Sequence, residues 1–219
     1  MVGKKASEES RREDILRAAY DVAARQGLEA LTLRAVAARA DVSHGTVMFH
    51  FKRKNELVVA LLDRVLYATA ILRIPDDVRQ ITRPLDRLHA VLRAEMDRLS
   101  TDPRHFRLFL EYWTIGVRNA PIRQRIRAAL ETYRGAFKEV AAEAVNGELL
   151  GSAQGRARQA PDAITIDGVA GVALSLVHGC ALQGVIDPKG FSIHQHFAAA
   201  SQMLERLTYR EQSGVTLAS

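Results

Sequence analysis

The chain has 219 residues, of which 47% are hydrophobic, and carries a net charge of +6 with a pI of about 9.8. This length allows one or two domains with a buried core, and the positive balance favours a polyanionic partner. The single cysteine, Cys180, excludes an intrachain disulfide and a cysteine-based zinc cluster. The first residues lack the apolar stretch of a signal peptide, so we expect a cytoplasmic protein with a polar N-terminal arm.

The first predicted helix runs from about Glu8 to Gln26. Its apolar residues recur at helical spacing opposite a face of Arg and Glu, which is the pattern of an amphipathic surface helix. Gly27 follows the last periodic residue and suits the C-terminal end of the helix.

The stretch from Thr32 to Lys54 predicts two short helices joined by a tight turn. Thr32 and Ser43 are good N-cap residues, and the apolar pattern breaks around Asp41 and Val42. Two capped helices at this spacing suggest a helix-turn-helix, whose second helix enters the DNA major groove. The alternative is an ordinary two-helix corner of an all-α protein. With the first helix, the pair would enclose a small core made of Leu28, Leu31, Leu33, Val36, Val42, Val47 and Phe51.

The rest of the chain also reads as helices, and no strand pattern is visible. We predict helices over Asn55–Arg73, Pro84–Leu99, His105–Arg118, Ile122–Val145, Ile164–Ile186 and Phe191–Tyr209. Asn146 to Ala163 has no periodicity and predicts a loop. The protein is therefore predicted to be all-α.

The helix Ile164–Ile186 is apolar on nearly every side and long enough to span a membrane. Asp167, His178 and Gln183 make insertion costly, so we expect no membrane contact and a helix buried on most sides. Its small residues lie four apart on one stripe where another helix can approach closely: Gly171, Ser175 and Gly179.

An aromatic stripe marks the helix His105–Arg118. The sequence leaves two interpretations open for it, an effector pocket or plain helix-packing core. The candidate pocket residues are Phe106, Phe109, Tyr112 and Trp113, together with His178, which could equally be a core or interface histidine. No metal or cofactor is expected: His194 and His196 do not share a helix face, and no catalytic motif is found.

The segment LTLRAVAARADVSHGTVMFHFKRKNEL resembles the DNA-binding region of TetR-family transcriptional regulators. The matching positions are Thr32, Val36, Ala37, Ala40, Val42, Ser43, Gly45, Thr46, Val47, His50, Phe51, Lys54 and Leu57. Around Phe109 to Phe137 the chain is also similar to the choline-responsive BetI-like branch. One departure is Met48, which stands where the family often has a tyrosine, and Phe49 also lacks a hydroxyl. Both could contact thymine methyl groups, or they could simply pack.

The resemblance implies a helix-turn-helix domain over residues 1–54 and a larger helical bundle over 55–219 for effector binding and dimerisation. Carried over by position, it implies phosphate contacts from Thr32, His50 and Lys54 and base contacts from His44, Thr46, Arg34 and Phe49. Gly45 would allow close backbone approach, and Ser43 and Met48 complete the DNA-binding set.

The implied function is a homodimer that binds a pseudo-palindromic double-stranded operator and is released by a small-molecule effector. Repression is the commoner outcome in the family, and activation stays open. The implied dimer interface is a four-helix one, which the stripe of Gly171, Ser175 and Gly179 suits. The rival class is a helical small-molecule-binding enzyme or carrier with an incidental two-helix corner. An architectural DNA binder without an effector is a third, which the large apolar C-terminal part disfavours.

Overall fold

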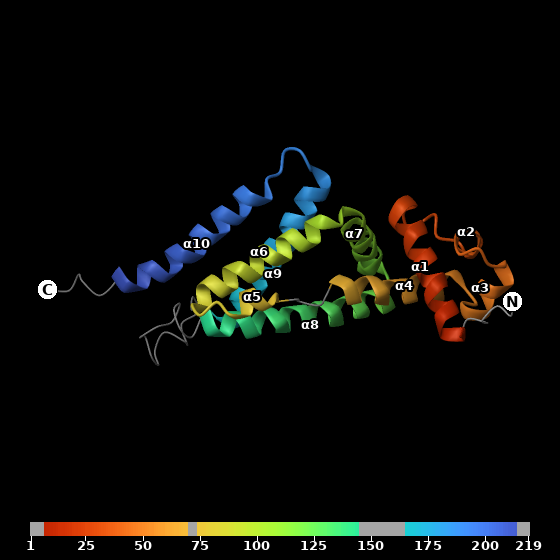
Figure 1. Cartoon of the computed structure of the whole chain (residues 1–219), viewed down its shortest axis with the longest axis horizontal. Helices are drawn as coiled ribbons and strands as arrows, with labels where there is room; N and C mark the ends of the chain where they lie inside the picture. The colour runs from red at the N-terminus through yellow and green to blue at the C-terminus, as the bar shows by residue number, and fades with distance from the viewer. Residues whose placement is uncertain (1–6, 70–73, 145–164, 214–219) are drawn as a thin grey trace. The chain divides into compact units, whose positions relative to one another are not determined.

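The computed structural model describes residues 7–69, 74–144 and 165–213, and all of its regular structure within those ranges is helical (Figure 1). The helices are α1 Glu8–Gln26, α2 Leu33–Arg39, α3 His44–His50, α4 Lys54–Thr69, α5 Asp76–Arg79, α6 Pro84–Thr101, α7 Pro103–Arg118, α8 Ala120–Ala144, α9 Ile166–Ile186 and α10 Ile193–Ser213. The predicted all-α class is confirmed.

The helices group into two compact units. One consists of the described residues of Met1–Thr69 with Arg104–Ala129, and the other of those of Ala70–Pro103 with Leu130–Ser219. Helix α8 therefore begins in the first unit and ends in the second. The predicted domain boundary after residue 54 divides the chain by function and does not coincide with the boundaries of the two compact units. The functional division stays a prediction.

In the first unit, α1 packs against α2 and α4, and α2 packs against α3. Helix α1 forms because the Ser7 hydroxyl accepts the Ser10 N–H at 3.1 Å and one face of the helix is apolar. Its end at Gly27 is as predicted. Of the predicted core, Leu33 and Val42 are only half-buried, while the other members are buried: Leu28, Leu31, Val36, Val47 and Phe51.

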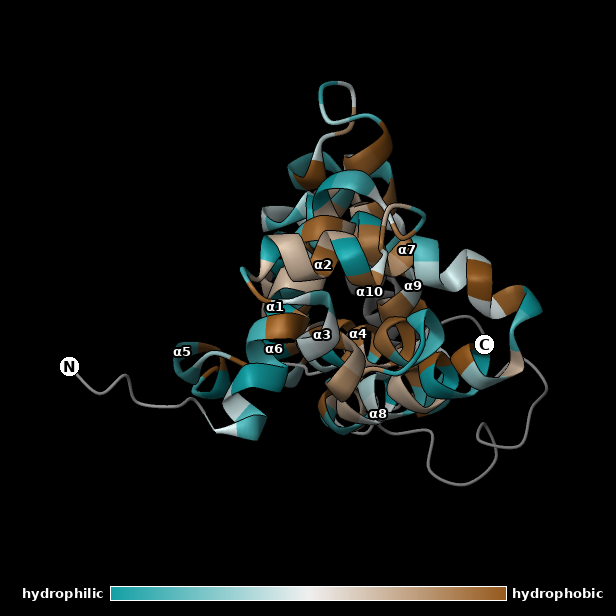
Figure 2. Ribbon diagram, turned by 90° about the vertical axis from the view of Figure 1, so that its right-hand side faces the viewer, coloured by the Kyte–Doolittle hydropathy of each residue, from teal (hydrophilic) through white to brown (hydrophobic). Residues whose placement is uncertain are grey.

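In the second unit, α6 packs along α9, and α10 contacts both (Figure 1). Helix α6 buries a stripe at three- and four-residue steps, and in Figure 2 polar and apolar residues are interleaved along the helices. A further short helix, α5, was not predicted, because Pro75 and two acidic residues look like a simple break. The predicted loop over 146–163 lies outside the described residues.

The prediction that the helix ending at Ile186 is buried on most sides is wrong for the single chain. Helix α9 buries one face, which includes Leu174, Val177 and Cys180, and leaves Val172 and Ile186 55% and 75% exposed. It is the one helix among the described residues that is long and apolar enough to cross a membrane, a test that core helices also pass. One apolar face of α9 therefore has no partner among the residues that the structure describes.

Candidate nucleic-acid interface

The predicted caps position the two short helices α2 and α3. The Thr32 hydroxyl accepts the Ala35 N–H at 3.0 Å, and the Ser43 hydroxyl accepts the Thr46 N–H at 3.0 Å. Between the helices, Asp41 has a φ of 52°, a left-handed conformation that Asp tolerates better than most residues. The Val42 N–H then donates to the Ala37 carbonyl at 3.1 Å. These local bonds set the angle at which α3 leaves the turn.

Helix α3 has a clear inside and outside. Val47 and the following Phe51 are buried and anchor it, while His44 and Gly45 are exposed. Thr46 and His50 are half-buried, with the Thr46 hydroxyl 2.8 Å from that of Ser43. Because a hydroxyl can donate and accept, Thr46 keeps hydrogen-bonding capacity for a further partner.

The two apolar residues of α3 do not pack into the core. Met48 is 45% exposed and Phe49 is 69% exposed, so the packing alternative does not describe them. The Phe49 ring meets the His50 ring edge-on, with centroids 5.2 Å apart. The exposed ring and the neighbouring methionine offer apolar surface whose burial by a partner would be favourable.

Basic side chains surround α3, but not all of them are equally available. Arg34, Lys52, Arg53 and Lys54 are exposed. Arg39, in contrast, forms an ion pair with Asp21 of α1. Lys54 donates to the Glu29 carbonyl at 3.3 Å, a contact that the sequence pattern did not reveal, and its ammonium has donors left for phosphate. Arg12 lies over the Phe51 ring at 5.1 Å, which was also missed because cation–π pairs leave no spacing signal.

The aromatic stripe lies in the first unit, mostly inside it. Phe106, Phe109 and Tyr112 are buried and Trp113 is half-buried, with ring centroids 5.9 Å apart for Phe106–Phe109 and 5.5 Å for Phe109–Trp113. The Tyr112 hydroxyl donates to the Val58 carbonyl at 2.8 Å. Burial, with the charges of Asp63 and Glu111, raises the Tyr112 pKa well above its ordinary value. This burial supports the core alternative, and a role in effector binding stays a prediction.

His178 belongs to the second unit, beside residues that sequence reasoning did not single out. Its ring stacks on Tyr133 at 6.0 Å, and burial lowers its pKa to about 4. The Tyr133 hydroxyl donates to Glu95 at 2.5 Å, and Arg98 donates to both Glu95 oxygens. Glu95 is only 1% exposed, the one buried charged side chain among the described residues. The signal was present, since Glu95 falls on the apolar stripe of α6, three residues after Leu92.

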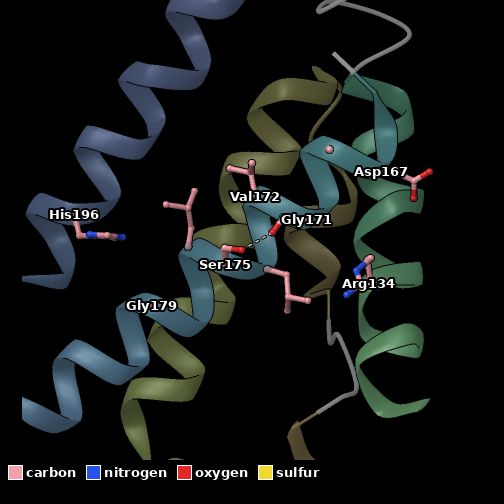
Figure 3. Close-up of a pocket in the computed structure, with 10 residues that line it drawn as sticks. Arg134, Asp167, Gly171, Val172, Ser175, Gly179 and His196 are labelled. Carbon is pink, nitrogen blue, oxygen red and sulfur yellow. Dashed lines mark hydrogen bonds between the residues drawn. The ribbon is translucent and has the colours of Figure 1, made fainter. Parts of the chain in front are cut away.

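The predicted small-residue stripe lines a hollow of about 560 Å³ in the second unit. Figure 3 shows Gly171, Ser175 and Gly179 along one side of α9, with Arg134 of α8 and His196 of α10 on either side. A Cβ at Gly171 or Gly179 would meet nothing within 4 Å. The Ser175 hydroxyl donates to the Gly171 carbonyl at 2.9 Å, so the middle of this stripe presents no free hydroxyl donor. Its role as a dimer interface stays a prediction.

Comparison with known proteins assigns the family. Residues 15–61 match the family model for bacterial regulatory proteins of the tetR family, and residues 84–208 match that for the C-terminal part of BetI-type transcriptional repressors. A Mycobacterium tuberculosis HTH-type transcriptional repressor is 43% identical over 91 residues, 38% of this chain and 45% of the relative. An HTH-type regulator from the dhlA 5′ region of Xanthobacter autotrophicus is 33% identical over 135 residues, 60% of this chain and 63% of that protein.

The matched segment thus spans less than half the length of the mycobacterial relative. Among solved structures, a Saccharomonospora viridis transcriptional regulator in complex with choline has a TM-score of 0.68 and 18% identity, over 90% of this chain and 96% of that one. At this identity the likeness shows the fold alone. Since the two family models together match most of the sequence, the chain belongs to the TetR family of DNA-binding transcriptional regulators, with a BetI-type C-terminal part.

Proposed function

We propose that the protein is a homodimeric repressor that binds a pseudo-palindromic operator through α3 of each copy and releases it when a small effector binds. Membership of a family of transcriptional regulators removes the enzyme-or-carrier alternative. The observation that carries the proposal is the surface of α3, where exposed Met48 and Phe49 lie beside His44 and Thr46 and the basic residues that follow. The operator lies on the chromosome, so we place the protein in the cytoplasm.

The proposed division of labour on DNA follows from chemistry. Lys54, Thr32 and His50 would contact phosphates and fix the register, since phosphate contacts carry no base information. His44, Thr46 and Arg34 would reach base edges, with Gly45 allowing close approach and Ser43 capping the helix. Met48 and Phe49 would cover thymine methyl groups, the main apolar feature of the major groove.

A second copy would supply the missing partner of α9. The face around Gly171, Ser175 and Gly179 is open and lined mostly by small and aliphatic residues of α9, which suits close helix packing. Dimerisation there would present two α3 helices to half-sites whose centres lie about 34–36 Å apart, or a multiple of that. The exposed side chains of Val172 and Ile186 would lose water on association, which is favourable.

For the effector we propose a small organic cation, with choline as the first probe. The supporting observations are the match to the BetI-type family model and the choline complex of the Saccharomonospora viridis regulator. The candidate contacts are Phe106, Phe109, Tyr112 and Trp113 in the first unit and, as a separate candidate in the second unit, His178; Trp113 and His178 are half-buried. The effector must bind the DNA-incompetent state more tightly, and operator DNA must reciprocally weaken effector binding.

The main test is a titration of the protein with its own upstream promoter DNA at several salt concentrations. Specific binding should be saturable, with a linear fall of log affinity with log salt. Equal affinity for scrambled DNA of the same composition would refute sequence-specific regulation. Choline chloride should then stabilise the protein to heat and release the DNA, and stabilisation without release would contradict an effector role.

Thymine readout has its own test. Replacing operator thymines one at a time by uracil removes only the methyl group, and at the position under Phe49 this should cost about fourfold in affinity, the value of one buried methyl. Phe49→Ala should bind the thymine and uracil duplexes equally. If the variant still prefers thymine at that position, another residue covers the methyl group.

A further inference from the structure

The C-terminal end of α1 is held by side chains of α7, which lies about eighty residues later in the chain. Arg107 Nη2 donates to the Ala24 carbonyl at 2.7 Å, and the Leu28 N–H donates to Glu111 Oε2 at 2.7 Å. The Tyr20 hydroxyl lies 3.2 Å from His105 Nδ1. We call Arg107 and Glu111, with their two bonds to α1 and its following turn, the α1–α7 clamp.

The clamp satisfies a carbonyl near the C-terminal end of α1 and a backbone N–H in the turn that follows. The last carbonyls of a helix have no partner within it, and the negative end of its dipole favours a cation such as Arg107. Leu28 is 5% exposed, so its N–H needs a protein acceptor, and the Glu111 carboxylate supplies a charge-assisted one. Arg107 and Glu111 are four residues apart and share one face of α7.

Gly27, in the turn after α1, lies directly against the Glu111 carboxylate of the clamp. Its φ of 84° lies in the region that favours glycine, and a Cβ there would lie 3.4 Å from Glu111 Oε2. The turn after α1 therefore brings the backbone against the carboxylate, at a position where most residues would be strained.

The clamp gives the helix-turn-helix a second attachment to α7. The first runs through α4, which follows α3 directly in the chain and whose Val58 carbonyl accepts the Tyr112 hydroxyl. Buried Phe106 and Phe109 fix α7 within the same unit. Helix α1 also packs against α4, and the clamp adds contacts with α7 at the C-terminal end of α1 that oppose rotation of the helix-turn-helix about α4.

We propose that Arg107 and Glu111 are positioning residues for operator recognition: the clamp fixes the orientation of α3 and thereby the half-site spacing that the dimer accepts. This rests on the proposed function, because spacing matters only to a dimer that reads two half-sites. A merely structural role would lower stability and weaken binding to every duplex by the same factor. A positioning role changes the discrimination between spacings.

The test uses the full-length protein and duplexes that the wild type selects from random-sequence DNA. Affinities are compared for the selected duplex and for versions with one or two base pairs inserted or deleted between the half-sites. The variants are Glu111→Ala, which removes the acceptor, and Glu111→Gln, which keeps a neutral one. Asp14→Asn is the matched control, because it neutralises a carboxylate of α1 that pairs with Arg17 on the exposed surface of that helix.

The wild type and Asp14→Asn should lose about tenfold or more in affinity when the spacing changes, a typical coupling between two sites. Glu111→Ala should bind all spacings within about threefold of one another, and Glu111→Gln should recover most of the discrimination. An unchanged spacing profile in Glu111→Ala overturns the proposal. If Glu111→Ala does not fold, Arg107→Ala decides it, because this variant removes the donor to the Ala24 carbonyl and an undiminished spacing preference in it overturns the proposal. A wild type that selects no duplex refutes the proposed function itself.

Discussion

Helices α3 and α9 both expose apolar side chains, yet their surroundings differ. On α3, Phe49 is 69% exposed and basic residues follow within a few positions. On α9, Ile186 is 75% exposed, and the open face is built from glycine, serine and aliphatic residues, with one charged residue, Asp167, near its start. Charge therefore separates two kinds of missing partner: a polyanion for α3 and another apolar helix for α9.

A glycine on each helix sharpens this comparison. Gly45 and Gly179 both have room for a Cβ in the single chain, the nearest atom at Gly45 being the Ser43 hydroxyl at 3.6 Å. Neither glycine is needed by the packing of its own unit. Substitution at either one should therefore damage binding more than folding.

The largest effect is expected from Gly179→Trp. The indole would prevent a second α9 from approaching, so the dimer should dissociate and operator affinity should fall by about a hundredfold or more, since two-site binding is lost. Analytical ultracentrifugation gives the mass, and Gly179→Ala is the graded control that should remain dimeric. A dimeric Gly179→Trp would place the interface elsewhere.

His178, on the inner side of α9, should make the stability of the protein depend on pH. The pKa of His178 is lowered from 6.5 to about 4, so the unfolded chain binds the extra proton first as the pH falls. The contribution of neutral His178 to the free energy of unfolding is therefore fully present above pH 6.5. It is lost as the pH falls to about 4, and the loss is about 3 kcal/mol at most. Urea unfolding across this range should show a smaller loss for His178→Gln than for the wild type. Equal pH profiles would mean that His178 titrates normally.

Gly45→Ala should separate folding from DNA binding on α3. Alanine stabilises a helix relative to glycine by about 0.5 kcal/mol, so the thermal midpoint should stay or rise slightly. Operator affinity should fall by about tenfold, the size of one lost base contact, because the methyl group holds the backbone away from DNA. Full affinity in this variant would show that the DNA does not approach Gly45.

The smallest effect is expected from Lys54→Ala. A lost phosphate contact weakens binding to all sequences equally and reduces the slope of log affinity against log salt by about 1. Lys189→Ala, an exposed lysine of the second unit, is the charge-matched control. Loss of preference at a single operator position would assign Lys54 to a base instead.

Most helix positions could be predicted from the sequence because caps and periodicity are local. Thr32, Ser43 and Gly27 act where the pattern indicated, and α6 begins at Pro84 as predicted. Contacts between distant segments could not be predicted, because nothing in the spacing connects Glu111 to Leu28 or Tyr133 to Glu95. The burial of α9 was predicted wrongly because a run of apolar residues indicates that a helix is buried, but does not say whether the same chain or a second one covers it.

The shortness of α3 has a practical consequence. Seven residues are too few for a helix to persist alone in water, where about 12–15 are needed even for favourable sequences. The Ser43 cap is local, but the side chains of Val47 and Phe51 hold the helix only because they pack into the core of the folded unit. A synthetic peptide copied from residues 43–54 would therefore be a poor decoy for the operator, and an inhibitor of this regulator should be designed against the folded protein or its DNA.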